Sequence, residues 1–138
     1  MKSFSVASVG LLLAATVLSA IGCSGSGSVQ EVVFDVELHI DGHPVPDVQV
    51  ALAPMDAPNA VPVLTGITDH SGIAGMMMVD GQVPSSDVTE YRVIVESLGD
   101  WRLAAPWSDP EKSPLAISWP SSEQTHLIEL PKKAVRRL

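Results

Sequence analysis

Hydrophobic and polar residues alternate with a period of two in the first part of the chain after residue 32. Phe34, Val36, Leu38 and Ile40 are separated by charged or polar residues, which is typical of a strand with one buried and one solvated face. Further short hydrophobic segments follow, most of them alternating as well, with turn residues between them. The pattern predicts strands at about residues 34–40, 48–53, 63–68, 73–79, 91–96, 115–119 and 125–130.

The spacing of hydrophobic residues predicts no helix of useful length. Residues 82–90 are too few and too polar for one, and prolines interrupt the long gaps. Short strands with turn signals between them predict an all-β domain over residues 31–131, a seven-stranded Greek-key β-sandwich. The basic tail, residues 132–138, is predicted to be a solvated, frayed end, with contact to anionic lipid or cell wall as the alternative.

Residues 1–22 have the layout of an export signal, with Lys2, then an apolar stretch, then small residues. The segment Ala20-Ile21-Gly22-Cys23 resembles the bacterial lipobox, whose cysteine thiol is joined to diacylglycerol before cleavage. The resemblance implies a lipoprotein signal peptide at 1–22, lipidation of Cys23, and membrane lipid as a partner. Residues 23–30 then form the lipidated cysteine and a flexible Ser/Gly linker. Cleavage after Ala20 or Gly22, which would release a secreted protein, and a membrane-spanning segment are the alternatives.

Cys23 is the single cysteine, so an internal disulfide is excluded. An acylated Cys23 would hold the protein at the cell envelope, on the outer membrane or the periplasmic face. Ser24 stands where Asp often marks retention in the inner membrane, and by resemblance to enterobacterial sorting this favours the outer membrane.

The body of the protein is strongly acidic. Residues 24–131 carry three basic and 16 acidic side chains, because four of the basic residues are crowded into the C-terminal tail. Such a body repels polyphosphates, so nucleic acid is not expected as a partner.

Neither the histidines nor the turn carboxylates have the pattern of a metal site. No two histidines have the spacing of a zinc site, and neither a metal nor a cofactor is expected. Three aspartates in or near turns could converge on calcium, but Asp is also a common turn residue. These residues are His39, His43, His70 and His126 in the first group and Asp69, Asp80 and Asp87 in the second.

Several segments resemble carboxypeptidase regulatory-like, transthyretin-like domains, and in particular the small lipoproteins of this kind that are common in planctomycete bacteria. Residues 41–50 (DGHPVPDVQV), 68–72 (TDHSG) and 90–95 (EYRVIV) correspond to the family's opening, turn and strand motifs. Residues 107–115 (WSDPEKSPL) and 128–131 (IELP) resemble the ending of the small lipoproteins. The resemblance implies a transthyretin-like or immunoglobulin-like sandwich that serves as a rigid, non-catalytic module.

The expected function is therefore a non-catalytic, lipid-anchored envelope module that is structural or binds an envelope protein. The alternative is a carbohydrate- or peptide-binding domain that uses Trp101 and Trp107, which lie in a long loop and could stack on a sugar. Packing over the end of a sheet is the competing role for these indoles. A hydrolase comes third, because the chain ends in VRRL where the hydroxyisourate hydrolases of this fold have a catalytic Tyr-Arg-Gly-Ser motif.

Overall fold

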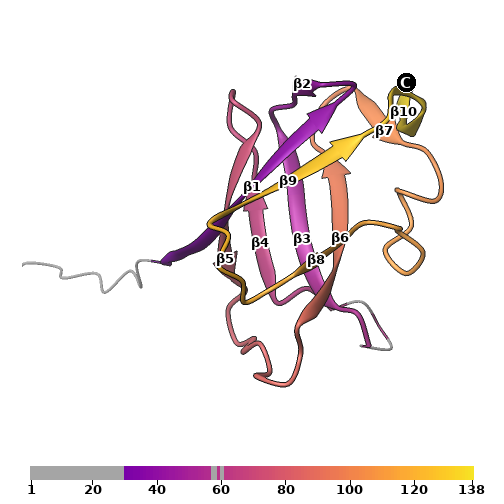
Figure 1. Cartoon of the computed structure of the whole chain (residues 1–138). Coiled ribbons are helices and arrows are strands. Elements are labelled where there is room, and N and C mark those ends of the chain that lie inside the picture. The colour runs from indigo at the N-terminus through magenta and orange to yellow at the C-terminus, as the bar shows by residue number, and fades with distance from the viewer. Residues whose placement is uncertain (1–29, 57–58, 60) are drawn as a thin grey trace, which may run out of the picture.

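The computed structural model describes residues 30–56, 59 and 61–138, and within them it is an all-β protein (Figure 1). The predicted signal peptide, Cys23 and most of the linker lie outside the described residues. The only helix in the described part is the three-residue 3-10 turn η1, which confirms the predicted all-β class. The elements are β1 (Val32–Ile40), β2 (His43–Pro44), β3 (Val48–Pro54), β4 (Leu64–Ile67), β5 (Ile73–Met78), β6 (Glu90–Ser97), β7 (Trp101–Leu103), β8 (Ala116–Ser118), β9 (Thr125–Leu130), η1 (Lys132–Ala134) and β10 (Val135–Arg137).

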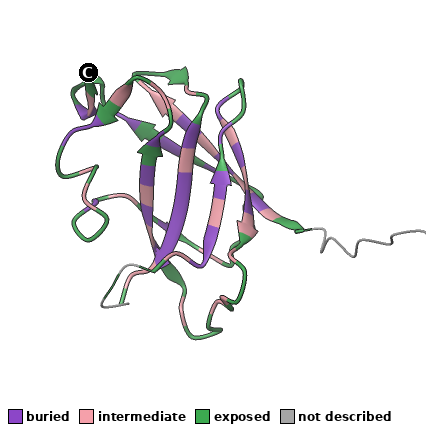
Figure 2. Cartoon of the chain, turned by 180° about the vertical axis from the view of Figure 1, so that it is seen from behind, coloured by how far each residue is buried: buried purple, intermediate pink, exposed green. Residues whose placement is uncertain are grey.

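Eight of the strands form one curled sheet. Its main path runs β8-β6-β3-β4-β5-β1-β9, with the short β2 beside the end of β1, while β7 and β10 form a separate two-stranded sheet. Every pairing is antiparallel except that of β1 with β9. Figures 1 and 2, which view the molecule from opposite sides, show β1 and β9 crossing one side of the core and β3, β4 and β6 covering the other. The curl therefore packs the sheet against itself, as in a β-sandwich.

The core follows the alternation that the sequence predicts. One side chain in two along β1, β6 and β9 is buried, and the purple segments of Figure 2 follow this pattern. The burial of these apolar side chains is the main source of stability for the domain. The largest fully buried side chains are Tyr91, Leu38, Leu52, Leu64, Met76, Leu130, Val36, Val48, Val50 and Val93.

The turn between β1 and β2 shows how local chemistry sets the register. Asp41 and Gly42 both have positive φ, 54° and 77°, which is the backbone of a two-residue type I′ hairpin. Asp followed by Gly is one of the sequences that this turn favours, because glycine has no Cβ to clash in the left-handed region. The Asp-Gly pair that follows the alternating residues 34–40 thus forms the turn into β2.

All seven predicted strands are present, but three further strands were missed, namely β2, β7 and β10. The prediction that residues 132–138 are frayed is wrong, because Val135–Arg137 pairs with Trp101–Leu103. Ala134 is fully buried, and its carbonyl accepts a hydrogen bond from the Ala104 N–H at 2.7 Å. β2 has two residues and β7 and β10 have three each, too few for a period-two signal, so only the pairing of β2 with β1 and of β7 with β10 reveals them.

Candidate binding site

The described residues include the candidate metal-site and tryptophan residues but not the predicted lipid anchor. Cys23, the predicted lipidation site, precedes the first described residue. Among residues 30–56, 59 and 61–138 there is no helix of the length and hydropathy needed to cross a bilayer. The same residues contain no group of three His, Cys, Asp or Glu side chains that could hold a metal ion.

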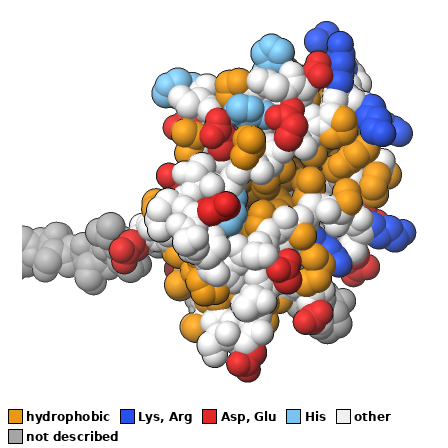
Figure 3. Space-filling model, viewed as in Figure 1, with side chains coloured by type: hydrophobic (Ala, Val, Ile, Leu, Met, Phe, Trp, Pro, Cys, Tyr) orange, Lys and Arg blue, Asp and Glu red, His pale blue; other side chains and the backbone are white. Residues whose placement is uncertain are grey.

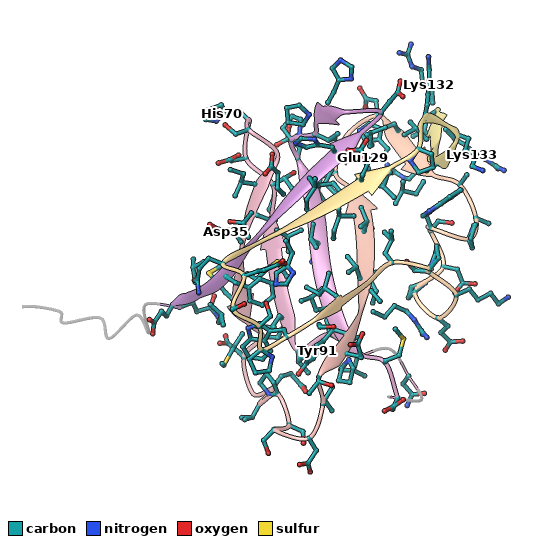
Figure 4. All side chains as sticks on the ribbon, in the orientation of Figure 1. Asp35, His70, Tyr91, Glu129, Lys132 and Lys133 are labelled. Atoms are coloured by element: carbon teal, nitrogen blue, oxygen red, sulfur yellow. The ribbon has the colours of Figure 1, made fainter. Side chains whose placement is uncertain are left out.

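Asp69 acts in the turn between β4 and β5. Its Oδ1 accepts hydrogen bonds from the N–H of Ser71 at 2.8 Å and of Ile73 at 3.1 Å. These bonds, that of Ile73 first, lower the pKa of Asp69 below its ordinary value of 3.8 because they favour the charged carboxylate. His70 projects from the same turn (Figure 4). The hydrogen bonds give Asp69 a turn role, which is the simpler of the two roles considered for it.

Trp101 and Trp107, the predicted binding residues, are both half-buried and pack against the core. Trp101 lies on β7 opposite Arg137 of β10. The Nζ of Lys133, from η1, lies 6.0 Å from the centre of the Trp107 ring, within reach of a cation–π contact. Figure 4 shows Lys132 and Lys133 at this corner. Residues of the C-terminal segment therefore lie beside both indoles, and neither ring is fully exposed for stacking on a sugar.

The outer edge of β9 presents backbone groups that point away from the sheet. The N–H of Asp35 donates to the carbonyl of Gln124, and the N–H of Asp41 donates to that of Leu130, so the even-numbered residues of β9 bond to β1. In a parallel pair the residues of opposite parity direct their backbone groups to the other side. These residues, Thr125, Leu127 and Glu129, are all exposed, and no second described strand pairs with β9.

The outer edge of β8 has the same character. The carbonyl of Leu115 accepts from the N–H of Val93, and the N–H of Trp119 donates to the carbonyl of Thr89, both at 2.9 Å. Odd-numbered residues therefore bond to β6, and Ala116 and Ser118 direct their backbone groups outward. Both residues are exposed, and β6 is the only described partner of β8.

A groove of about 470 Å³ lies between these two edges. We call it the β8–β9 groove, and Figure 3 shows hydrophobic side chains gathered on this face between the paths of the two strands. The ring of His126 is buried and meets that of Phe34 edge-on at 5.2 Å. The groove is lined by Ala116, Ile117, Ser118, Ser121, Ser122, Glu123, His126 and Leu127.

Ser121, His126 and Glu123 of the groove lie next to one another as a serine, a histidine and a carboxylate do in a hydrolytic triad. The distances between them do not favour catalysis. The Nε2 of His126 lies 3.5 Å from the Oγ of Ser121, and its Nδ1 lies 3.6 Å from the Oε2 of Glu123. A nucleophile and its base normally lie about 2.6–3.2 Å apart. The Oγ of Ser121 also accepts the N–H of Glu123 at 3.1 Å, an ordinary turn contact. These contacts shape the loop between β8 and β9.

Sequence reasoning missed the β8–β9 groove. His126 shares the parity of Ile128 and Leu130 along β9, and like them it is buried. The spacing of Ser121, Glu123 and His126 could have suggested a cluster in one tight loop. No sequence signal could have shown that β8 and β9 are the two end strands of the sheet, because strand order depends on pairings between distant segments.

No family model, no curated protein and no solved structure matches this chain.

Proposed function

We propose that this protein is a non-catalytic, lipid-anchored module of the bacterial cell envelope that binds another protein. Acylated Cys23 and the Ser/Gly linker would hold the folded domain near the membrane surface. The resemblance to carboxypeptidase regulatory-like lipoproteins and the lipobox-like segment support the location. The observation that carries the binding role is the pair of exposed strand edges at the β8–β9 groove, since such edges are ready-made sites for association.

A glycan-binding role for Trp101 and Trp107 is less favoured. Sugar stacking needs an accessible indole face, and both rings are half-buried against the core. The hydrolase role is less favoured for the reason given above, the long distance between Ser121 and His126.

The anchor is tested by expressing the full chain in a bacterial host and measuring the intact mass of the mature protein. We expect a diacylglycerol-modified and N-acylated Cys23 as the first residue, in the membrane fraction. Cys23→Ala should abolish the modification and release the membrane-bound pool, whereas Ser24→Ala, as the neighbouring control, should leave both unchanged. An unmodified, freely secreted wild-type chain would refute the lipid anchor.

The binding role is tested separately in intact cells by placing a photo-crosslinking amino acid on the surface. We expect a discrete crosslinked protein adduct from position 127 at the β8–β9 groove. Position 98 carries a comparably exposed leucine elsewhere and should give none. Identical patterns from the two positions would contradict a partner at the groove.

A further inference from the structure

We propose that the β8–β9 groove binds a basic, extended segment of the partner protein, which adds to the free edge of β9 as a further strand. This inference rests on the proposed protein-binding function and names the chemistry of the partner. The occupant is an extended polypeptide with alternating basic and apolar side chains.

The backbone of β9 supplies the main recognition element. Thr125, Leu127 and Glu129 each direct an N–H and a C=O away from β1, which is sufficient for about six hydrogen bonds to a neighbouring strand. These groups lie in register along an uninterrupted strand of six residues. Main-chain bonds of this kind give affinity in strand addition, whatever the sequence of the added segment.

The edge of β9 has little of the protection that exposed edges usually carry. Natural sheets blunt their edges with lysine, proline, bulges or very short strands. β9 has six residues, contains neither lysine nor proline, and places Leu127 on the edge with 61% of its surface exposed. The other end strand, β8, has only three residues and forms the opposite wall of the groove.

The groove selects side chains on the inner face of an added strand. One side chain in two would face the groove wall, where Ile117 is 9% and His126 is 8% exposed. A small apolar residue such as valine would contact Ile117 at this position, beside the serine hydroxyls and Glu123 that line the rest of the groove, and the alternate residues would face solvent.

The charge of the site favours a basic segment. None of the eight lining residues is lysine or arginine, and Glu123 is 71% exposed at the connecting loop. Glu90, whose carboxylate accepts the hydroxyl of Ser118, adds negative charge beside β8, whereas the Glu129 carboxylate lies toward β1, where its Oε1 accepts the Gly42 N–H at 2.7 Å. Complementary charge accelerates association and selects among partners.

The test uses a fluorescent peptide, acetyl-(Lys-Val)3-amide, and the chain expressed from residue 1 and purified in a neutral detergent. We expect saturable binding by fluorescence anisotropy, and hydrogen-exchange protection concentrated in residues 125–130. The charge-reversed peptide acetyl-(Glu-Val)3-amide should bind at least about tenfold more weakly. Methylation of alternate backbone nitrogens of the lysine peptide should cause a similar loss, and this control leaves the protein unchanged.

Single substitutions distinguish binding at the β9 edge from nonspecific electrostatic attraction to the acidic protein. Leu127→Pro removes an N–H that points to the groove, and Leu127→Lys places a positive charge there, so each should weaken binding about tenfold. Leu98→Lys adds the same charge at a site with 54% exposure away from the groove and should change affinity less than about twofold.

Several results would overturn the inference. They are an absence of binding up to about 1 mM peptide, equal binding of the acidic or methylated peptide, and protection outside residues 116–130. A concentration-dependent dimer that Leu127→Lys abolishes would show that a second copy occupies the edge instead. Acylated Cys23 with no peptide binding would refute this inference and leave the anchor intact, while peptide binding with an unmodified Cys23 would do the reverse.

Discussion

The corner formed by β7 and β10 differs from the β8–β9 groove in the pairing of its strand edges. The edge of β7 is paired with β10, whereas the outer edges of β8 and β9 have no partner strand in the described part of the chain. All four strands follow β6 in the chain. β8 and β9 are the end strands of the main sheet, while β7 and β10 form the separate two-stranded sheet. At the corner, the C-terminal segment returns and pairs with β7, residue for residue from 135 to 137. At the groove, no described strand pairs with the outer edges of β8 or β9.

The difference shows that aromatic content is a poor guide to where this protein has free binding capacity. The two tryptophans that suggested a binding loop lie at the corner that the chain itself covers. The exposed backbone lies in β8 and β9, which carry no tryptophan. There the unpaired N–H and C=O groups of the strand edges, rather than an unusual side chain, provide the ability to bind.

The largest effect should come from proline substitutions at adjacent residues of β9. Ile128→Pro removes a backbone donor to β1 and a side chain that is 5% exposed, and should lower the free energy of unfolding by about 3–5 kcal/mol. Leu127→Pro removes a donor that faces the groove and should cost about 1 kcal/mol or less. Urea denaturation measures both values, and equal losses would contradict the assignment of a free edge.

Deletion of residues 132–138 should have the next largest effect. It removes the buried Ala134 and uncovers Leu103 and the two neighbouring indoles, and should lower the free energy of unfolding by about 2–3 kcal/mol. Tryptophan fluorescence should shift to longer wavelength. As the control, Lys132→Ser with Lys133→Ser retains β10 and should change stability by about 0.5 kcal/mol at most. A truncated chain with wild-type stability would mean that the corner is open like the groove.

Substitution of the corner tryptophans should change stability and leave glycan binding unchanged. Trp101→Ala and Trp107→Ala each remove a half-buried ring, at a cost of about 1–2 kcal/mol in the free energy of unfolding. Thermal melts and a glycan array, each with the wild-type chain as reference, measure the two properties. Loss of a glycan signal at unchanged stability would restore the carbohydrate-binding alternative.

The smallest effect should be a loss of folding stability at alkaline pH, caused by ionisation of Tyr91 beside β8. Tyr91 lies opposite Ile117 of β8, its ring centre is 6.0 Å from that of Trp119, and its burial raises its pKa above the ordinary value of 10.0. The unfolded chain therefore loses this proton at a lower pH than the folded one, so stability falls as pH rises through about 10. Thermal melts between about pH 9 and 11 should show this decline.

Tyr91→Phe should remove that part of the alkaline decline, since phenylalanine has no proton to lose. The matched control is Phe34→Leu, measured over the same pH range, because it changes the ring that packs against Trp119 at 5.7 Å but keeps the Tyr91 phenol, and it should retain the alkaline decline. Identical alkaline profiles for the wild-type chain and Tyr91→Phe would show that ionisation of Tyr91 does not weaken the attachment of β8.

The sequence by itself determined the all-β class and the position of each strand long enough to alternate. Phe34 to Ile40 and Thr125 to Leu130 are examples, because a strand with one buried face must place apolar residues at every second position. It also determined the Asp41-Gly42 turn, whose positive φ values suit a local pair of residues.

Only the tertiary structure decided the order of the strands and the fate of their edges. Residues 135–137 become a strand because residues 101–103 are there to receive them, and His126 comes to face Phe34 because β9 pairs with β1. Hydrogen bonds between strands join residues that are far apart in the chain, and the period-two alternation of a strand is the same whether its edge is paired or open. The location of a free edge is therefore a property of the assembled sheet.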